Sequence, residues 1–307
     1  MNIEKEKRAI EYLRAFQPQT EPYYLCYSGG KDSDTILTLA EVAGVNFEAV
    51  HNLTTVDAPE TVNFIRSQPK IKINYPEISM WDLIVERKMP PTRLARYCCE
   101  VFKEQGGKSR VKITGVRWAE STNRKESAGV VKVIGKPKTM QKKATDMGVD
   151  YRVTKQQGLI LNDDNAESRR FVEHCYRTTS TMVNPIVDWS DDDVLEFLCH
   201  YGIKINPLYE AESSKGKYIC KGCKRIGCIC CPLSGYEEMK ADLIKYPKYR
   251  DNYLRAFDRM LKKRAALGLK TSDVWADARK VMMWWVGDNP LQISFFGEPT
   301  YLAGACM

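Results

Sequence analysis

Residues 28–33 read Ser-Gly-Gly-Lys-Asp-Ser and directly follow the apolar run at 23–27. The apolar run has the pattern of a buried strand, and residues 34–40 have the pattern of a helix. Two glycines allow the backbone between them to turn tightly and to approach a ligand closely. Such a turn presents backbone N–H groups and the positive end of the helix to an anion, beside a lysine and two serine hydroxyls. The sequence therefore predicts an α/β fold with a phosphate-binding loop near its start.

This loop lacks the Walker pattern, in which four residues separate the first glycine from Gly-Lys. It resembles the PP-loop of the ATP pyrophosphatases, which bind ATP, release pyrophosphate and transfer AMP. The resemblance implies ATP and Mg²⁺ as ligands, bound by Ser28, Gly29, Gly30, Lys31, Asp32 and Ser33. Lys31 and the loop amides would hold the triphosphate, and Asp32 is suited to Mg²⁺ or to fixing the loop. The alternative is a plain Gly-Gly turn with exposed polar side chains.

Strands and helices are expected to alternate over about residues 22–118. The expected strands are 23–27, 47–51, 71–73 and 110–116, and the expected helices are 34–43, 58–67, 79–87 and 92–104. This alternation predicts an α/β fold with a doubly wound parallel sheet. The resemblance to the PP-loop enzymes implies that this fold is adenine nucleotide alpha hydrolase-like. In such sheets the ligand binds at the carboxyl ends of the strands.

Four residues near these strand ends are further candidates for the site. Gly115 is expected in the nucleotide site, and His51, at a strand end, is expected to face the adenine. Arg117 and Arg124 follow the strand that ends near Gly115 and could clamp a phosphate of the acceptor. With Lys31 and Asp32 they form the predicted catalytic set. The alternative for both arginines is surface salt bridging.

After residue 118 the sequence changes character. Residues 119–170 are polar with little periodicity, which predicts a partly mobile insertion. Helices are expected at 190–201, capped by Ser190, and then at 234–267 and 271–286. The sequence thus predicts three regions: a nucleotide-binding region at 1–118, a basic insertion that returns to the sheet at 119–183, and a helical, cysteine-rich region at 184–307.

The positive charge of the chain is concentrated in one stretch. Residues 103–143 carry twelve Lys or Arg and three Glu, whereas the whole chain has a net charge of +8. A surface of this kind suits a polyanion, either a nucleic acid or a phosphorylated substrate. The alternative is a solvated loop, and charge alone does not separate the two.

The composition of the chain indicates the cellular compartment in which it is expected to work. No apolar stretch approaches the roughly 20 residues of a membrane span. The chain begins with a charged helical pattern at 1–8 rather than a signal peptide. Eleven cysteines without an export signal indicate a reducing cytoplasm, where clustered thiols bind metal more often than they form disulfides. We therefore expect a cytoplasmic protein without a membrane partner, and the sequence leaves a homo-oligomer open.

The cysteines allow two alternative interpretations of a metal site. Residues 220–231 hold five cysteines, and a Cys98-Cys99 pair lies far upstream. One interpretation is a compact zinc or iron site made by two Cys-x2-Cys pairs, which are Cys220, Cys223, Cys228 and Cys231. The other combines the upstream pair with Cys228 and Cys231 as four thiolates of a [4Fe–4S] cluster. Free buried cysteines are the alternative to both.

A Cys-Cys pair followed over a hundred residues later by Gly-Cys-x-x-Cys-Pro resembles the iron–sulfur branch of the phosphoadenosine phosphosulfate reductase family. Further matching pieces follow in order: Pro59-Glu60-Thr61, Gly115 to Ser121 with Arg124, Asn184 to Trp189 with Asp193-Val194, and Asn206-Pro207-Leu208-Tyr209. The resemblance spans about residues 22–260. It implies that Cys98, Cys99, Cys228 and Cys231 are the cluster ligands. Cys220, Cys223 and Cys230 lie outside the usual pattern and leave open a second metal, alternative ligation or persulfide chemistry.

Two departures from the reductases stand out. Reductases carry a degraded loop because they do not cleave ATP, whereas this loop is intact. They also carry a nucleophilic cysteine in a Glu-Cys-Gly-Leu-His tail, whereas Cys306 stands in Ala-Gly-Ala-Cys-Met. In addition, the Asp-Thr-Gly expected after the second strand is replaced by residues 52–55. This combination looks more like the ATP pyrophosphatase subunits of DNA phosphorothioation systems and the related proteins of phages.

Three functions follow from these resemblances. The first is ATP-dependent sulfur incorporation into nucleic acid, with DNA as partner and a cysteine desulfurase as sulfur donor. The second is a sulfonucleotide reductase that makes sulfite with Cys306 and a thioredoxin-like donor. The third is a nucleic-acid-binding module with a structural cluster. The intact loop favours the first function.

Overall fold

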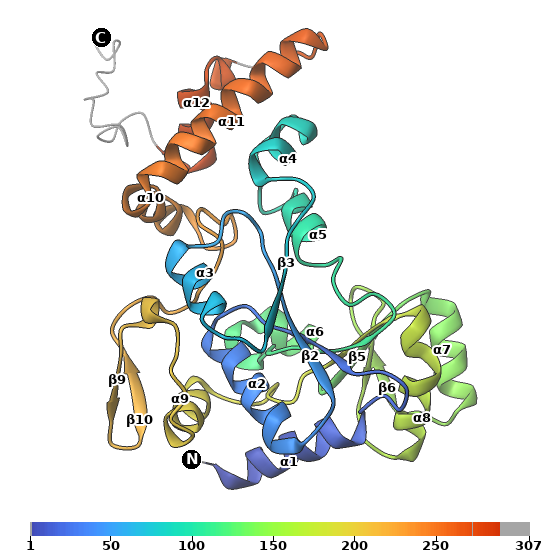
Figure 1. The fold of residues 1–307 in the computed structure, drawn as a ribbon. Coiled ribbons are helices and arrows are strands. Elements are labelled where there is room, and N and C mark those ends of the chain that lie inside the picture. The colour runs from blue at the N-terminus through green and yellow to red at the C-terminus, as the bar shows by residue number, and fades with distance from the viewer. Residues whose placement is uncertain (1, 272, 289–307) are drawn as a thin grey trace, which may run out of the picture. The chain divides into compact units, whose positions relative to one another are not determined.

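The computed structural model describes residues 2–271 and 273–288, and it divides into two compact units (Figure 1). The chain passes between the units several times. Unit 1 consists of Met1–Asn52, Pro59–Asn74 and Gly106–Ile226, and unit 2 consists of Leu53–Ala58, Tyr75–Gln105 and Gly227–Met307. The boundaries expected near residues 118 and 183 both fall within unit 1.

A large mixed sheet forms the centre of unit 1. In the described residues its strand order is β3-β2-β1-β4-β8-β5-β7-β6. The first five in this order are parallel: β3 (Ile71–Asn74), β2 (Phe47–Asn52), β1 (Tyr23–Cys26), β4 (Val111–Ile113) and β8 (Ser180–Val183). The other three run antiparallel to their neighbours: β5 (Val131–Ile134), β7 (Leu159–Leu161) and β6 (Tyr151–Val153). The predicted parallel α/β sheet is confirmed, with an antiparallel edge that was not expected.

Helices flank this sheet (Figure 1). Unit 1 contains α1 (Ile3–Ala15), α2 (Lys31–Ala43), α3 (Pro59–Arg66), α6 (Thr122–Ser127), α7 (Pro137–Asp146), α8 (Ala166–Cys175) and α9 (Asp191–His200). Helix α2 packs against α1 and α9. Helix α9 begins at the expected cap, because the Ser190 hydroxyl accepts the N–H of Asp193 at 3.1 Å. Along β1 and α2 most apolar side chains are buried, with Val42 exposed, so the first strand and one face of the helix lie in the core.

The low periodicity at 119–170 hid regular secondary structure. This stretch forms α6, β5, α7, β6, β7 and the first half of α8, and β5 pairs with β8 through Val131 and Val183. The strands are only three or four residues long, and Leu159, Ile160 and Leu161 are all buried. Such short strands give too few residues for a periodic pattern to stand out from the polar sequence around them.

A hairpin was also missed in the region expected to be helical. Strands β9 (Ala211–Ser214) and β10 (Lys217–Cys220) pair antiparallel. Lys215 and Gly216 join them with φ values of 49° and 80°. Two positive φ angles in a two-residue loop are typical of a type I′ turn, whose twist matches that of the strands.

Unit 2 contains the remaining helices: α4 (Met80–Arg87), α5 (Tyr97–Phe102), α10 (Tyr236–Lys245), α11 (Pro247–Ala266) and α12 (Ala278–Trp285). The single helix expected at 234–267 is divided at Tyr246, because Pro247 cannot donate a backbone hydrogen bond and instead starts α11. The helix expected at 92–104 is shorter, since Thr92 closes a turn with Ala95 before α5 begins. None of the helices in residues 2–271 and 273–288 has the length and apolarity to span a membrane.

Aromatic side chains fill the core of unit 2. Helix α11 packs against α4 and α12. Tyr253 lies at the centre, with ring centroids 4.8 Å from Trp81 and 4.7 Å from Trp285. Each polar tip has a partner, because the Tyr253 hydroxyl donates to the carbonyl of Ile229 and the Trp285 indole donates to the carbonyl of Pro91. These bonds fix the segments that carry the cysteines of unit 2.

Candidate functional site

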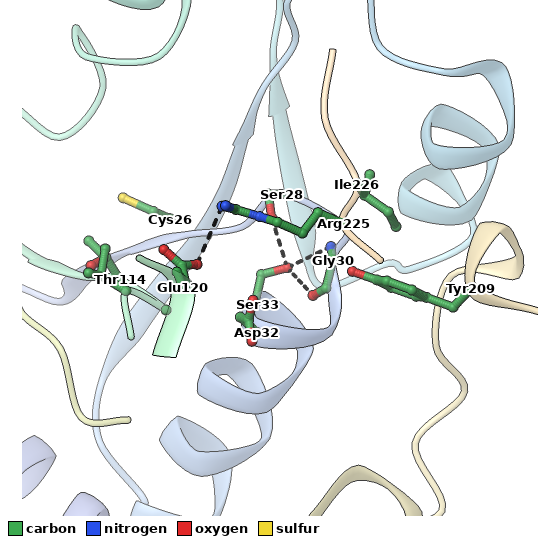
Figure 2. A pocket seen from close by; sticks show the side chains of 12 residues that line it. Cys26, Ser28, Gly30, Asp32, Ser33, Thr114, Glu120, Tyr209, Arg225 and Ile226 are labelled. Atoms are coloured by element: carbon green, nitrogen blue, oxygen red, sulfur yellow. Dashed lines mark hydrogen bonds and ion pairs between the residues drawn. The ribbon is translucent and has the colours of Figure 1, made fainter. Parts of the chain in front are cut away.

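The Ser-Gly-Gly-Lys-Asp-Ser loop forms a tight turn directly before α2 (Figure 2). Gly29 has a φ of 74°, and a Cβ there would lie 3.0 Å from the side chain of Ile65. The Ser33 hydroxyl accepts the Gly30 N–H at 3.0 Å and donates to the Gly30 carbonyl at 2.7 Å. The second and third loop positions therefore depend on glycine and on this serine for their shape.

A cavity of about 170 Å³ opens beside this loop. It lies where the segments after β1 and β4 meet, and β1 is the strand from which the sheet continues in both directions, to β2 and to β4. This is the switch point at which α/β sheets bind ligands. The lining residues are Cys26, Ser28, Gly30, Asp32, Ser33, Thr114, Gly115, Val116, Glu120, Tyr209, Arg225 and Ile226.

Five of the predicted binding residues line this cavity, and three do not. Those that line it are Ser28, Gly30, Asp32, Ser33 and Gly115. A Cβ at Gly115 would lie 3.0 Å from the carbonyl oxygen of Asp32, so glycine allows the two loops to approach each other. The residues outside the lining are Gly29, Lys31 and His51. The roles of all eight remain predictions.

Lys31 is buried beside the cavity, with 6% of its surface exposed. Its ammonium group donates to the carbonyl of Lys224 at 3.2 Å and lies 3.2 Å from the Asp191 carboxylate. It also lies 5.6 Å from the centre of the Tyr209 ring, within the range of a cation–π contact. To reach a phosphate in the cavity, this ammonium would exchange these partners for the phosphate oxygens.

Arg117 is the most buried cation of the site, at 2% exposure. Its guanidinium donates to the carboxylates of Asp32 and Asp191, each at 2.8 Å, and to the carbonyl of Trp189 at 3.2 Å. Burial alone would lower the pKa of Arg117, but the charges of the two carboxylates raise it. With its donors directed in this way, the side chain holds Asp32 and thereby the first turn of α2.

Asp191 completes this ionic network. Partial burial would raise the pKa of Asp191, but the hydrogen bond from Arg117 and the charge of Lys31 lower it below the ordinary value of 3.8. The sequence placed Asp191 only within the helix expected at 190–201. Its contact with a residue 74 positions away could not be read from local pattern.

Two other predicted residues have clear partners. His51 is buried, and its Nδ1 lies 3.1 Å from the carbonyl oxygen of Tyr27. Arg124, on α6, is half exposed and lies 3.3 Å from the carboxylate of Glu120. That carboxylate lines the cavity, although Arg124 itself does not.

The motif that contains Asn206 and Tyr209 stood out in the sequence, but neither residue had a role there. The Tyr209 hydroxyl accepts the N–H of Lys31 at 3.1 Å, and burial raises the pKa of Tyr209. The Asn206 amide, 1% exposed, donates to the carbonyl of Gly29 and to the Thr61 hydroxyl. These side chains hold the loop through its backbone, whereas Arg117 holds it through the Asp32 side chain, and the motif itself was the available signal.

In unit 2, the four predicted cluster ligands line one small cavity of about 20 Å³. Cys98 and Cys99 come from α5, and Cys228 and Cys231 come from a loop that Cys230 also shares. The described residues contain no group of three or more His, Cys, Asp or Glu side chains that is already arranged to hold a metal ion. Cys220 and Cys223 belong to unit 1 and do not line this cavity.

Hydrogen bonds within unit 2 bring the cysteine segments together. The N–H of Ile229 donates to the carbonyl of Val56 at 2.8 Å, and the Cys228 thiol lies 3.5 Å from the Thr54 hydroxyl. The negative charge of an ionised Cys228 is the main cause that raises the pKa of Lys103, which also lines the cavity. A cation thus stands beside thiols that would carry negative charge as metal ligands.

A model of the phosphoadenosine phosphosulfate reductase domain matches residues 22–234. The match covers well over half of the chain, so the chain belongs to this family, whose fold binds nucleotides at a PP-loop. Comparison with curated protein sequences gives no match.

Among solved structures, the FMN adenylyltransferase of Candida glabrata is similar to this chain, with a TM-score of 0.37 and 12% sequence identity. The same enzyme in complex with ATP gives a TM-score of 0.36 and 13% identity. Both alignments cover 67% of this chain and 57% of the other, so this chain spans little more than half the length of that enzyme. The family assignment rests on the sequence match.

Replacing Arg117 by Met should lower the free energy of unfolding by about 2–3 kcal/mol. This is less than the 3–5 kcal/mol for a fully buried pair, because the Asp191 side chain is 64% exposed. Urea denaturation at pH 7 measures the change. The control Arg124→Met, at a half-exposed surface pair, should cost less than about 1 kcal/mol. Equal losses in the two variants would show that Arg117 does not organise the site.

The loss caused by Arg117→Met should also depend on pH. Because the pKa of Asp191 is lowered, its contribution is fully present above the ordinary value of 3.8 and disappears as the pH falls through the lowered value. The difference between the wild type and the variant should therefore narrow below pH 3.8 and stay constant above it. A constant difference down to the lowest measurable pH would contradict the ionic network.

Proposed function

We propose that this chain is an ATP pyrophosphatase of the phosphoadenosine phosphosulfate reductase family, which transfers AMP to an acceptor so that sulfur can replace oxygen. The observation that carries the proposal is the intact PP-loop beside a cavity at the switch point of the sheet. The cavity wall offers the start of α2, two serine hydroxyls and a glycine that admits close approach. This combination suits the phosphates of ATP.

The residues of the cavity divide the work of AMP transfer. The loop amides and the hydroxyls of Ser28 and Ser33 would bind the triphosphate, and Lys31 would neutralise its charge. The acceptor oxygen attacks the α-phosphorus, the bond to the bridging oxygen breaks, and pyrophosphate leaves. Mg²⁺, with Asp32 as the candidate ligand, would neutralise charge that builds on the leaving group. Arg117 acts as a positioning residue in this scheme, because it holds Asp32.

AMP transfer turns a poor leaving group on the acceptor into a good one. A persulfide on a partner such as a cysteine desulfurase then attacks the activated centre, AMP leaves with the original oxygen, and a thiol reductant cleaves the remaining S–S bond. We propose DNA phosphate as the acceptor. The exposed lysines of α7, on the face opposite the buried Met140 and Ala144, support a polyanionic partner.

The cysteines of unit 2 fit an iron–sulfur cluster in their chemistry. Four thiols that line one cavity, Cys98, Cys99, Cys228 and Cys231, form the usual ligand set of [4Fe–4S]. A cavity of about 20 Å³ would have to widen to admit the group. When bound, such a cluster would relay sulfur or electrons, or it would fix α5 to the Cys228–Cys231 loop.

A second candidate is a sulfonucleotide reductase, which the family membership favours. It would form sulfite with Cys306 as nucleophile, and Cys306 lies outside the described residues. Sulfite production from a free sulfonucleotide, abolished in Cys306→Ser, would support the reductase. The intact loop is the reason for placing AMP transfer first.

Purified protein with ATP and Mg²⁺ should release AMP and pyrophosphate, and Lys31→Ala or Ser33→Ala should reduce the rate at least about a hundredfold, because each removes a group from the triphosphate site. The control Lys70→Ala removes a lysine from an exposed pair with Glu41 and should leave the rate unchanged. The assay is run with and without DNA. Undiminished pyrophosphate release in both loop variants would rule out the PP-loop as the reaction site.

Anaerobically purified protein should be brown, absorb broadly at about 400 nm and contain about four irons per chain. Serine at position 98, 99, 228 or 231 should bleach the protein, because each removes a thiolate from the shared cavity. The matched control Cys220→Ser, in unit 1, should keep the iron. If the wild type were colourless and contained one zinc, and the Cys220→Ser variant had lost that zinc, the compact site with two Cys-x2-Cys pairs would be established instead.

If α7 binds DNA, the affinity should weaken steeply with salt, because each neutralised phosphate releases counterions. Changing the exposed Lys136, Lys138 and Lys142 to Glu should weaken binding further and lower the salt slope by about one for each phosphate that is no longer neutralised. The matched control changes three exposed lysines of α11 to Glu, namely Lys248, Lys262 and Lys263. Equal effects of the two triple variants would show that α7 is not the DNA-binding surface.

A further inference from the structure

One cation lies across the nucleotide cavity without a role in the reaction proposed for it. Arg225 lines the cavity, and its guanidinium reaches the carboxylate of Glu120 on the opposite wall, at 3.5 Å (Figure 2). The Arg225 side chain is 66% exposed, whereas that of Glu120 is only 9% exposed. The mobile partner of this pair is therefore the arginine.

The Glu120 carboxylate lies close to two guanidinium groups, and of these two arginines only Arg225 lines the cavity. Arg225 pairs with Oε1, and the Nε of Arg124 lies 3.3 Å from Oε2. Oε2 is buried and makes no hydrogen bond within the described residues. A carboxylate, like a phosphate, accepts charge-assisted hydrogen bonds from the guanidinium fork of arginine. Glu120 thus occupies donors that would suit a phosphate.

The size of the cavity points in the same direction. Its volume of about 170 Å³ lies below the range of roughly 300–1,000 Å³ for ligand pockets. A nucleotide bound here would displace a wall or extend beyond the cavity. Tyr209, another wall, is 2% exposed and fixed by its bond to Lys31. Rotation of the exposed Arg225 side chain enlarges the cavity without moving the core.

The segment that carries Arg225 is anchored just before it. Gly222 and Cys223 donate backbone hydrogen bonds to the carbonyls of Tyr209 and Leu208, both at 2.9 Å. A Cβ at Gly222 would lie 2.3 Å from the carbonyl oxygen of Leu208, so this close approach requires glycine. The next residue, Lys224, accepts the hydrogen bond from Lys31. Arg225 is thus held next to the lysine of the PP-loop.

We propose that Arg225 is a phosphate-binding residue of the nucleotide site and that Glu120 competes with the phosphates for it. The ligand is a nucleoside triphosphate or the pyrophosphate released from it. Binding moves the Arg225 guanidinium from Glu120 to a phosphate oxygen, and no covalent bond changes. This inference rests on the proposed ATP site and adds a residue that the PP-loop motif does not contain.

Calorimetric titration of the full chain with inorganic pyrophosphate, and then with ATP and Mg²⁺, tests the competition. Arg225→Gln should raise the Kd for pyrophosphate about tenfold, because a charge-assisted hydrogen bond is removed. Glu120→Gln should lower the Kd about threefold or more, because the arginine is released. The matched control Lys221→Gln removes a charge from the same segment, where it pairs with Glu212, and should leave the Kd unchanged. Circular dichroism verifies that each variant is folded.

The double variant separates competition from simple charge. In the Arg225→Gln background, Glu120→Gln should hardly change the Kd for pyrophosphate, since the Arg225 guanidinium is no longer there to be released. Equal effects of Glu120→Gln in both backgrounds would overturn the inference. So would an Arg225→Gln variant that binds like Lys221→Gln while Lys31→Ala abolishes binding, and in that case the ATP site itself would stand. A wild type that binds neither ligand would overturn both proposals.

Discussion

The buried guanidinium of Arg117 is the interaction on which the nucleotide site depends. A charge with 2% exposure is unfavourable unless its donors are paired, and here they meet Asp32, Asp191 and the carbonyl of Trp189. The fork of donors is planar and rigid, so these partners have little freedom. They belong to the first turn of α2, the first turn of α9 and the residue just before its cap. One side chain thereby relates the PP-loop to the helix that packs against α2.

The charge balance of the same network determines how much positive charge a phosphate ligand would still require. Lys31 and Arg117 are balanced by Asp32 and Asp191, so the four side chains together are close to neutral. A triphosphate brings several negative charges, and a neutral network cannot compensate them. A triphosphate bound as proposed would need additional cations, of which Mg²⁺ would be one. Arg225 is the other cation that the cavity wall offers, and its pairing with Glu120 keeps its charge compensated until a stronger anion arrives.

The sequence predicted those parts of the molecule that local pattern determines. Strand β1, the glycine loop and α2 follow from an apolar run, two glycines and a helical repeat, and the structure confirms the parallel strands around them. The antiparallel edge was missed because β6 and β7 have only three residues each. The partners of Lys31 were missed for another reason: the carbonyl that it meets lies 193 residues away. Any carbonyl can accept a hydrogen bond, so no residue type marks that interaction.

The cysteine-rich stretch contributes residues to one cavity in each unit. Arg225 and Ile226 line the nucleotide cavity of unit 1, and Cys228 lines the thiol cavity of unit 2. Backbone bonds anchor both ends of this stretch, at Cys223 to Leu208 and at Ile229 to Val56, each within its own unit. Few residues remain between the two anchors to absorb a change in backbone conformation. For a substitution in this stretch, ATP cleavage and metal content should therefore be measured on the same variant before either effect is assigned.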